Sequence, residues 1–177
     1  MSRLRTLGVL SIGAILITAN NAFANKYIEE IGNYMQVIVP AYAFGMTMNE
    51  QDWTGARQFA YSFAATEASV FGLKSVIDER RPNGSNKNSF PSGHSAAAFS
   101  GAVFIHRRYG IQRAILPYAM AGFVGYSRIA SDMHYLHDVA AGAVIGGLFS
   151  WFLASKYENI CVSAGPNHAG IEFKTKF

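Results

Sequence analysis

Cysteine is almost absent from this chain of 177 residues, because Cys161 is the only one. A single cysteine excludes an intramolecular disulfide, and nothing in the sequence has the spacing of a zinc or iron–sulfur site, so we interpret Cys161 as a small buried thiol. Charge is also sparse: Asp, Glu, Lys and Arg make up 15% of the residues, and the formal net charge is +4. Because several basic residues sit inside short motifs and form no long run, the sequence gives little support to nucleic-acid binding.

The first residues have the layout of a secretory signal peptide. Arg3 and Arg5 are followed by an uncharged stretch over residues 6–19 and then by Ala22-Phe23-Ala24. A basic start, a short apolar segment and an A-x-A site predict cleavage after Ala24, with an uncleaved membrane anchor over residues 1–24 as the alternative. Residues 25–177 are long enough to bury one sizeable core, so we expect a single domain there.

After Ala24 the apolar residues follow a helical period. No alternating strand pattern persists, and the breakers Gly55, Gly110 and Pro82-Asn83-Gly84 fall between the apolar stretches. The sequence therefore predicts an all-α fold, a bundle of about five to six apolar helices. Five of them have readable ranges, which are residues 31–48, 59–77, 95–105, 114–126 and 139–155.

Length and charge give opposing indications of whether these helices cross a bilayer. A span needs about 20 apolar residues, which only 31–48 and 139–155 approach, and Glu67 would be a costly charge inside a span. If the mature N-terminus is outside and each helix crosses once, however, the loops after the second and fourth helices face outward. The basic segment from His106 to Arg113 then faces inward, as membrane proteins prefer. We expect a bundle embedded in or tightly bound to the membrane, with a soluble bundle as the alternative.

Three separate segments carry residues suited to binding a phosphate group. Ser92-Gly93-His94 directly precedes the helical residues 95–105, and the free N–H groups at a helix N-terminus attract anions. Arginine binds a dianion with two parallel hydrogen bonds and lysine offers a compact charge, so together they can replace a magnesium clamp. The cations that we expect to converge on one phosphate are Lys74, Arg81 and Arg128.

His134 and Asp138 are four residues apart, so on a helix or a tight turn they share a face. Asp138 would then fix the tautomer of His134, which leaves the other ring nitrogen free to attack phosphorus. His94 would protonate the leaving oxygen and later take a proton from the attacking water. We interpret His106 and His168 as structural, and the role of His137, which neighbours Asp138, stays open.

Together these residues resemble the type 2 phosphatidic acid phosphatase (PAP2) family, which shares its site with vanadium haloperoxidases and bacterial class A acid phosphatases. The family pattern is K-x6-R-P, P-S-G-H and S-R-x5-H-x3-D, and the segments 74–82, 91–94 and 127–138 match it without a departure. The resemblance implies that His134 is the nucleophile, Asp138 its orienting carboxylate and His94 the general acid and base. It also implies the phosphate ligands Lys74, Arg81, Ser92, Gly93 and Arg128, and it implies no metal or other cofactor.

The resemblance, the apolar helices and the outward-facing loops predict a phosphatase of the inner membrane with its active site on the periplasmic side. Its substrate would be a lipid phosphate or pyrophosphate, such as phosphatidic acid, phosphatidylglycerol phosphate, undecaprenyl pyrophosphate or lipid A. Selectivity would lie in residues 83–90 and 129–133. Two alternatives remain, a soluble periplasmic acid phosphatase similar to class A and a non-catalytic phospholipid-binding membrane protein. Haloperoxidases are much longer chains, which argues against their activity.

Overall fold

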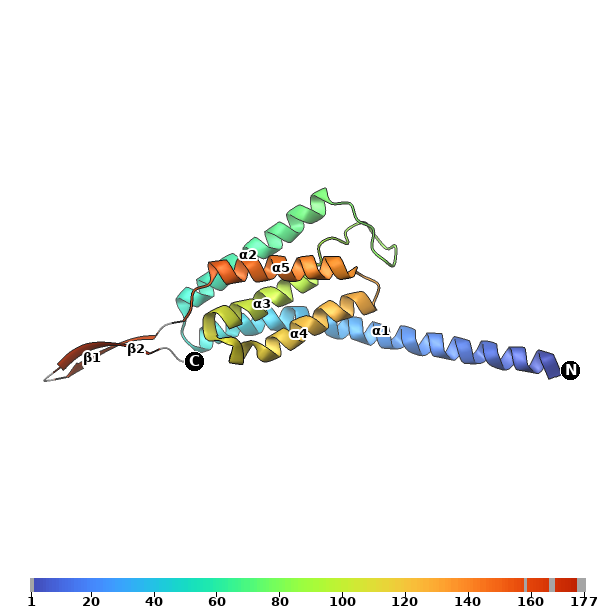
Figure 1. Cartoon of the computed structure of the whole chain (residues 1–177), viewed down its shortest axis with the longest axis horizontal. Helices are drawn as coiled ribbons and strands as arrows, with labels where there is room; N and C mark the ends of the chain where they lie inside the picture. Colours follow the sequence, from blue (N-terminus) through green and yellow to red (C-terminus); the bar gives the residue numbers. More distant parts are fainter. Residues whose placement is uncertain (1, 158, 166–167, 175–177) are drawn as a thin grey trace.

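The computed structural model describes residues 2–157, 159–165 and 168–174, with side chains for residues 25–157. Cys161 and His168 therefore lie outside the described side chains. Five helices form a bundle within these ranges, and a two-stranded antiparallel hairpin follows them and extends away from the bundle (Figure 1). The elements are α1 Ser2–Asn49, α2 Trp53–Val76, α3 Gly93–Tyr109, α4 Ile111–Ala130, α5 Leu136–Leu153, β1 Asn159–Gly165 and β2 His168–Lys174.

Helix α3 is the centre of the bundle and packs against the four other helices. Its sequence is rich in alanine, and Ala96, Ala98 and Ala102 are fully buried. The glycines of α5 allow its close contact with α3, because a Cβ atom at Gly142 would overlap the carbonyl oxygen of Ser92 and one at Gly146 would overlap that of Ala96. Small residues four apart let two helix backbones approach closely, as is common between membrane helices.

Two capping residues, Asp52 and Ser92, fix the first residues of α2 and α3. Asp52 caps α2, since its Oδ1 accepts a 2.9 Å hydrogen bond from the backbone N–H of Gly55. Ser92 caps α3 by accepting from the N–H of Ser95 at 3.4 Å. Such caps satisfy backbone donors that the first helical turn leaves free. Gly110 joins α3 to α4 with a φ of 95°, a conformation that favours glycine.

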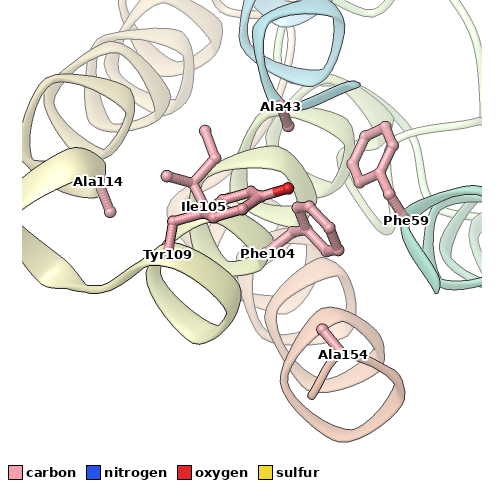
Figure 2. Close-up of a cluster of buried hydrophobic side chains, with 7 residues drawn as sticks. All are labelled: Ala43, Phe59, Phe104, Ile105, Tyr109, Ala114 and Ala154. Carbon is pink, nitrogen blue, oxygen red and sulfur yellow. The ribbon is translucent and has the colours of Figure 1, made fainter. Parts of the chain in front are cut away.

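The largest cluster of buried apolar side chains lies toward the C-terminal end of α3 (Figure 2). Phe104 contacts Phe59 of α2 with ring centroids 4.9 Å apart and Tyr109 at 6.2 Å. Tilted and edge-on aromatic pairs of this kind stabilise a core beyond the area that they bury. The other members of the cluster are Ala43, Ile105, Ala114 and Ala154. This core anchors the end of the bundle opposite to the start of α3.

The five expected helices are confirmed, with ends that differ by up to six residues, except that α1 begins at Ser2 and not near residue 31. The hairpin was not predicted, and the expectation that no strand pattern persists was wrong for residues 159–174. Among the described residues, one helix, Leu136–Leu153, is long and apolar enough to cross a membrane, and a single such helix is a weak indication of spanning.

Candidate active site

Two loops and the start of α3 meet at the end of the bundle where α2 and α4 finish. Residues 77–92 connect α2 to α3, and residues 131–135 connect α4 to α5. The backbone N–H of Ser92 donates to the carbonyl oxygen of Asp138 at 3.0 Å, and the N–H of Asn83 donates to Asp132 at 3.0 Å. These bonds hold the two loops against each other, so the three sequence segments expected to bind phosphate share one end of the fold.

His134 and Asp138 form the pair that the spacing predicted. The Nδ1 of His134 lies 3.4 Å from Oδ2 of Asp138. The same carboxylate oxygen accepts a hydrogen bond from the hydroxyl of Ser89 and one from the backbone N–H of Tyr135 at 2.9 Å. Both partners are buried, with 3% of His134 and none of Asp138 exposed. With Nδ1 facing the carboxylate, Nε2 is the nitrogen whose lone pair can act as a nucleophile.

The surroundings of His134 keep its imidazole neutral. Burial, followed by the positive charges of Arg81 and Lys74, lowers the pKa of His134 to about 4, and Asp138 opposes this shift. A neutral ring at neutral pH is what a nucleophilic histidine needs, because an imidazolium has no lone pair to donate. The backbone N–H of His134 donates to the carbonyl oxygen of Arg128 at 3.2 Å, which ties the histidine to a neighbouring cation.

The three cations converge as expected, since the charges of Lys74, Arg81 and Arg128 all act on His94. The Nζ of Lys74 donates to the carbonyl oxygen of Asn88 at 2.7 Å. The Nε of Arg81 is buried and has no hydrogen-bond partner among the described residues. A buried guanidinium N–H without an acceptor is costly, so it indicates a place where an anionic ligand supplies the acceptor.

The N-terminus of α3 lies beside these cations. The hydroxyl of Ser92 is fully buried and is used as a cap, so its oxygen already accepts from Ser95. The backbone N–H groups of Gly93 and His94 follow this cap and have no hydrogen-bond partner among the described residues. A Cβ atom at Gly93 would make only an ordinary contact with Val70 at 3.6 Å, so space remains above this turn. The first turn of α3 can therefore receive a phosphoryl oxygen.

His94 is half-buried and contacts a residue that the motifs do not include. Its Nε2 lies 3.0 Å from Oδ1 of Asn33 in α1, and the same oxygen accepts a 2.8 Å hydrogen bond from Nη1 of Arg128. A cavity of about 400 Å³ opens next to His94 between α1, α2 and α3. Its lining includes the side chains of Val37, Phe63 and Glu67.

His137 is exposed and contacts two carboxylates. Its Nε2 lies 2.7 Å from Oε1 of Glu79 and 3.1 Å from Oδ1 of Asp138. Its ring stacks on Tyr135 with centroids 5.4 Å apart. Glu79, His137 and Asp138 are a group among the described residues whose ligand atoms could hold a metal ion. The direct contact between Glu79 and His137 already gives both side chains a partner.

Sequence reasoning missed Asn33 and Ser89, which contact the predicted site residues His94, Arg128 and Asp138. The contacts join positions that are 49 to 95 residues apart in the chain. Short motifs cannot reveal pairs of this kind. The sequence around Asn33 offers no clear signal, because other polar residues of α1, among them Glu29, Glu30 and Gln36, lie close to it in the chain.

Comparison with known proteins gives consistent results. The family model described as the PAP2 superfamily matches residues 55–160. The lipid A 4'-phosphatase of Helicobacter pylori is 27% identical over 142 residues, which cover 74% of this chain and 71% of that protein. The lipid A 1-phosphatase of the same organism is 27% identical over 170 residues, covering 82% and 87%. The crystal structure of a transmembrane PAP2 type phosphatidylglycerolphosphate phosphatase from Bacillus subtilis superposes with a TM-score of 0.58 at 23% identity, covering 74% and 75%.

Proposed function

Because the chain belongs to the PAP2 superfamily, we propose that it is a metal-independent lipid phosphatase that acts through a phosphohistidine intermediate. One observation carries the proposal. A buried, neutral histidine oriented by a carboxylate lies near Arg81 and Lys74, and Arg81 has a buried N–H without an acceptor. The charges of these two cations and of Arg128 also act on His94. This combination suits in-line attack on a phosphate dianion whose charge the protein itself neutralises.

In the first step Nε2 of His134 attacks phosphorus, and the bond from phosphorus to the lipid oxygen breaks. Asp138 stabilises the positive charge that develops on the ring of His134. His94 reacts in its protonated form, which the bound phosphate dianion favours; it gives a proton to the leaving oxygen and becomes neutral, so the lipid departs as a neutral alcohol. Lys74, Arg81 and Arg128 hold the equatorial phosphoryl oxygens together with the first turn of α3.

In the second step a water molecule attacks the phosphohistidine. His94, now neutral, takes a proton from this water as the new bond to phosphorus forms, and the bond from phosphorus to Nε2 breaks. Inorganic phosphate leaves and His134 returns to its neutral form. Over a complete cycle His94 gives up one proton and regains one, His134 forms and breaks one bond to phosphorus, and no step needs a metal ion.

A lipid substrate is supported by the surface of the bundle. Large apolar side chains are exposed on the four helices that surround α3, which are α1, α2, α4 and α5, and Phe71 and Phe152 are each 77% exposed. Exposed apolar area on this scale is typical of a face covered by lipid. The cavity beside His94 leaves room for the group attached to the phosphate. The names of the bacterial relatives make lipid A the first substrate to test.

We further propose that the protein lies in the inner membrane with its active site on the periplasmic side. The support is the signal-like start of the sequence and the charge at the opposite end of the bundle, where Arg107, Arg108 and Arg113 flank the turn between α3 and α4. Basic residues next to membrane helices favour the cytoplasmic side. Cleavage after Ala24 stays a prediction, and the residues that build the site all follow it.

Phosphate release by the detergent-purified protein tests the proposal. The substrates are lipid A, phosphatidylglycerol phosphate, phosphatidic acid, undecaprenyl pyrophosphate and p-nitrophenyl phosphate. We expect one of the lipids to be the best substrate and His134→Ala to lose turnover, because the substitution removes the covalent step. His106→Gln is the matched control, since His106 contacts Tyr118 at 3.0 Å far from the site. Near-normal activity of His134→Ala would end the phosphohistidine assignment, and preference for the soluble ester would favour an exported acid phosphatase.

A chelator and vanadate test the metal-independent part of the proposal. We expect activity to survive a chelator and to be blocked by vanadate, which imitates five-coordinate phosphorus. Loss of activity with chelator and its recovery with a divalent ion would contradict the proposed mechanism. Repeating that experiment with Glu79→Gln would show whether the ion acts through the group formed by Glu79, His137 and Asp138.

A further inference from the structure

Asn33 of α1 lies between two residues of the proposed site. Its side-chain oxygen is 2.8 Å from Nη1 of Arg128 and 3.0 Å from Nε2 of His94. The residues matched by the PAP2 family model begin at position 55, so Asn33 lies on a helix outside that match. Helix α1 therefore contributes a polar contact that the three motifs do not contain.

The chemistry of Arg128 decides which atoms face each other. A guanidinium only donates hydrogen bonds, so the atom of Asn33 that faces it must be the carbonyl oxygen and not the amide nitrogen. That oxygen can only accept, and the Nε2 of His94 must therefore carry a hydrogen and donate it. The contact holds the hydrogen on Nε2, and it leaves Nδ1 as the ring nitrogen through which His94, our proposed general acid and base, exchanges a proton with the leaving oxygen and with water.

A glycine in α1, Gly32, allows this helix to lie close to Arg128. A Cβ atom at Gly32 would overlap Oγ of Ser127 and would lie 2.7 Å from Nη2 of Arg128. The same Nη2 donates a 2.7 Å hydrogen bond to the backbone carbonyl oxygen of Glu29. A residue with a side chain at position 32 would push α1 away from Arg128, so Gly32 holds Asn33 within reach of both partners.

We propose that Asn33 is the positioning residue of His94, which it orients through a neutral acceptor, whereas Asp138 orients His134 through a charged one. This inference rests on the proposed function. A carboxylate stabilises an imidazolium, but an amide does so much less, and His94 therefore gives up its proton readily to the leaving oxygen as the phosphorus–oxygen bond breaks. The titratable and charged groups that face His94 from the surrounding elements are Arg128, His134, Arg81, Lys74 and, across the cavity, Glu67.

The first test compares two leaving groups in Asn33→Ala. The substrates are p-nitrophenyl phosphate, whose phenol leaves with little need of a proton, and the lipid phosphate that the wild type hydrolyses fastest. We expect kcat/KM for the lipid to fall about tenfold or more and kcat/KM for the aryl ester to fall much less. Equal losses for both substrates would overturn the inference, because a purely structural role affects them alike. Glu30→Gln, an exposed position on the same helix, is the matched control.

The second test places a carboxylate at the same position with Asn33→Asp. A negative charge beside His94 favours the imidazolium, so the basic limb of the kcat/KM profile should move up by about one pH unit or more. An unchanged profile in a variant that elutes and melts as the wild type does would contradict the inference. If wild type and Glu30→Gln release no phosphate from any substrate, the proposed function itself fails and this inference fails with it. Activity in both, with unaltered behaviour of the Asn33 variants, removes only the inference.

Discussion

Two buried arginines at opposite ends of the bundle have opposite surroundings. Arg108, 5% exposed, contacts the carboxylate of Asp52 through Nη2 at 2.6 Å and Nε at 2.7 Å. Arg128, 2% exposed, donates to the neutral oxygens of Ser127, Asn33 and Glu29, and no carboxylate oxygen within the described side chains lies within ion-pair distance of it.

The difference supports the proposal that Arg108 stabilises the fold at one end of the bundle and that Arg128 binds phosphate at the other. Burying a charge is costly unless an opposite charge and hydrogen bonds compensate for it. Asp52 provides this at Arg108, with further bonds from Arg108 to the backbone of Ser155 and from the hydroxyl of Tyr109 to Asp52. At Arg128 the hydrogen bonds are present, but within the described side chains no carboxylate forms an ion pair with it, and the charge of Glu29 acts only from a greater distance. We infer that the substrate phosphate supplies it.

Removing the charge of Arg108 should have the largest effect, which we expect to be a loss of stability. In Arg108→Gln the carboxylate of Asp52 stays buried without its ion pair, so we expect the free energy of unfolding to fall by about 3–5 kcal/mol. Thermal unfolding in detergent measures the loss, and specific activity of the folded fraction should be unchanged. The double variant Asp52→Asn, Arg108→Gln should recover part of the loss. A stable Arg108→Gln with impaired turnover would reverse the roles assigned to the two ends.

Removing the charge of Arg128 should reduce activity more than stability. Arg128→Gln keeps a hydrogen-bonding side chain but loses the cation, and we expect kcat/KM to fall about 10²–10³-fold, equivalent to about 2.7–4 kcal/mol of transition-state stabilisation. Vanadate inhibition should weaken in parallel, because the same charge binds the analogue. An Arg128→Gln protein that melts well below the wild type and turns over normally would show that Arg128 is structural, like Arg108.

The smallest expected effect concerns pH. The pKa of folded His134 is lowered to about 4 by burial and by Arg81 and Lys74, whereas an unfolded histidine has a pKa of about 6.5. The unfolded state therefore takes up the proton first as the pH falls, and stability decreases from pH 6.5 toward pH 4. At pH 6 the loss should be about 1 kcal/mol. His134→Gln should flatten the dependence of the melting temperature over this range, and an identical dependence in both proteins would argue against the shift.

The sequence predicted the helices and the residue types of the site because both have local signatures. The helical period of the apolar residues located five helices, and the four-residue spacing of His134 and Asp138 located the oriented pair. The convergence of Lys74, Arg81 and Arg128 was expected from their suitability for one phosphate and agreed with the resemblance, because their separation along the chain does not itself bring them together. The structure adds their common position at the start of α3.

The missed features depend on tertiary contacts or on weak local patterns. Asn33 lies 95 residues from Arg128 and 61 from His94, so only the packing of α1 reveals its role. The strands β1 and β2 were missed because they come directly after the helical pattern of residues 139–155. Their one local signal in the sequence is Gly165-Pro166-Asn167, a typical turn composition. The continuation of α1 to Ser2 was not expected, because the first residues were interpreted as a targeting segment.

One oxygen atom, Oδ2 of Asp138, takes part in both folding and chemistry. It accepts from the backbone N–H of Tyr135 at the start of α5, from the hydroxyl of Ser89 in the loop before α3, and it faces Nδ1 of His134. The first turn of a helix, the position of a loop and the tautomer of His134 therefore share a single acceptor. A substitution at position 138 therefore alters the start of α5 and the position of Ser89 as well as the orientation of His134.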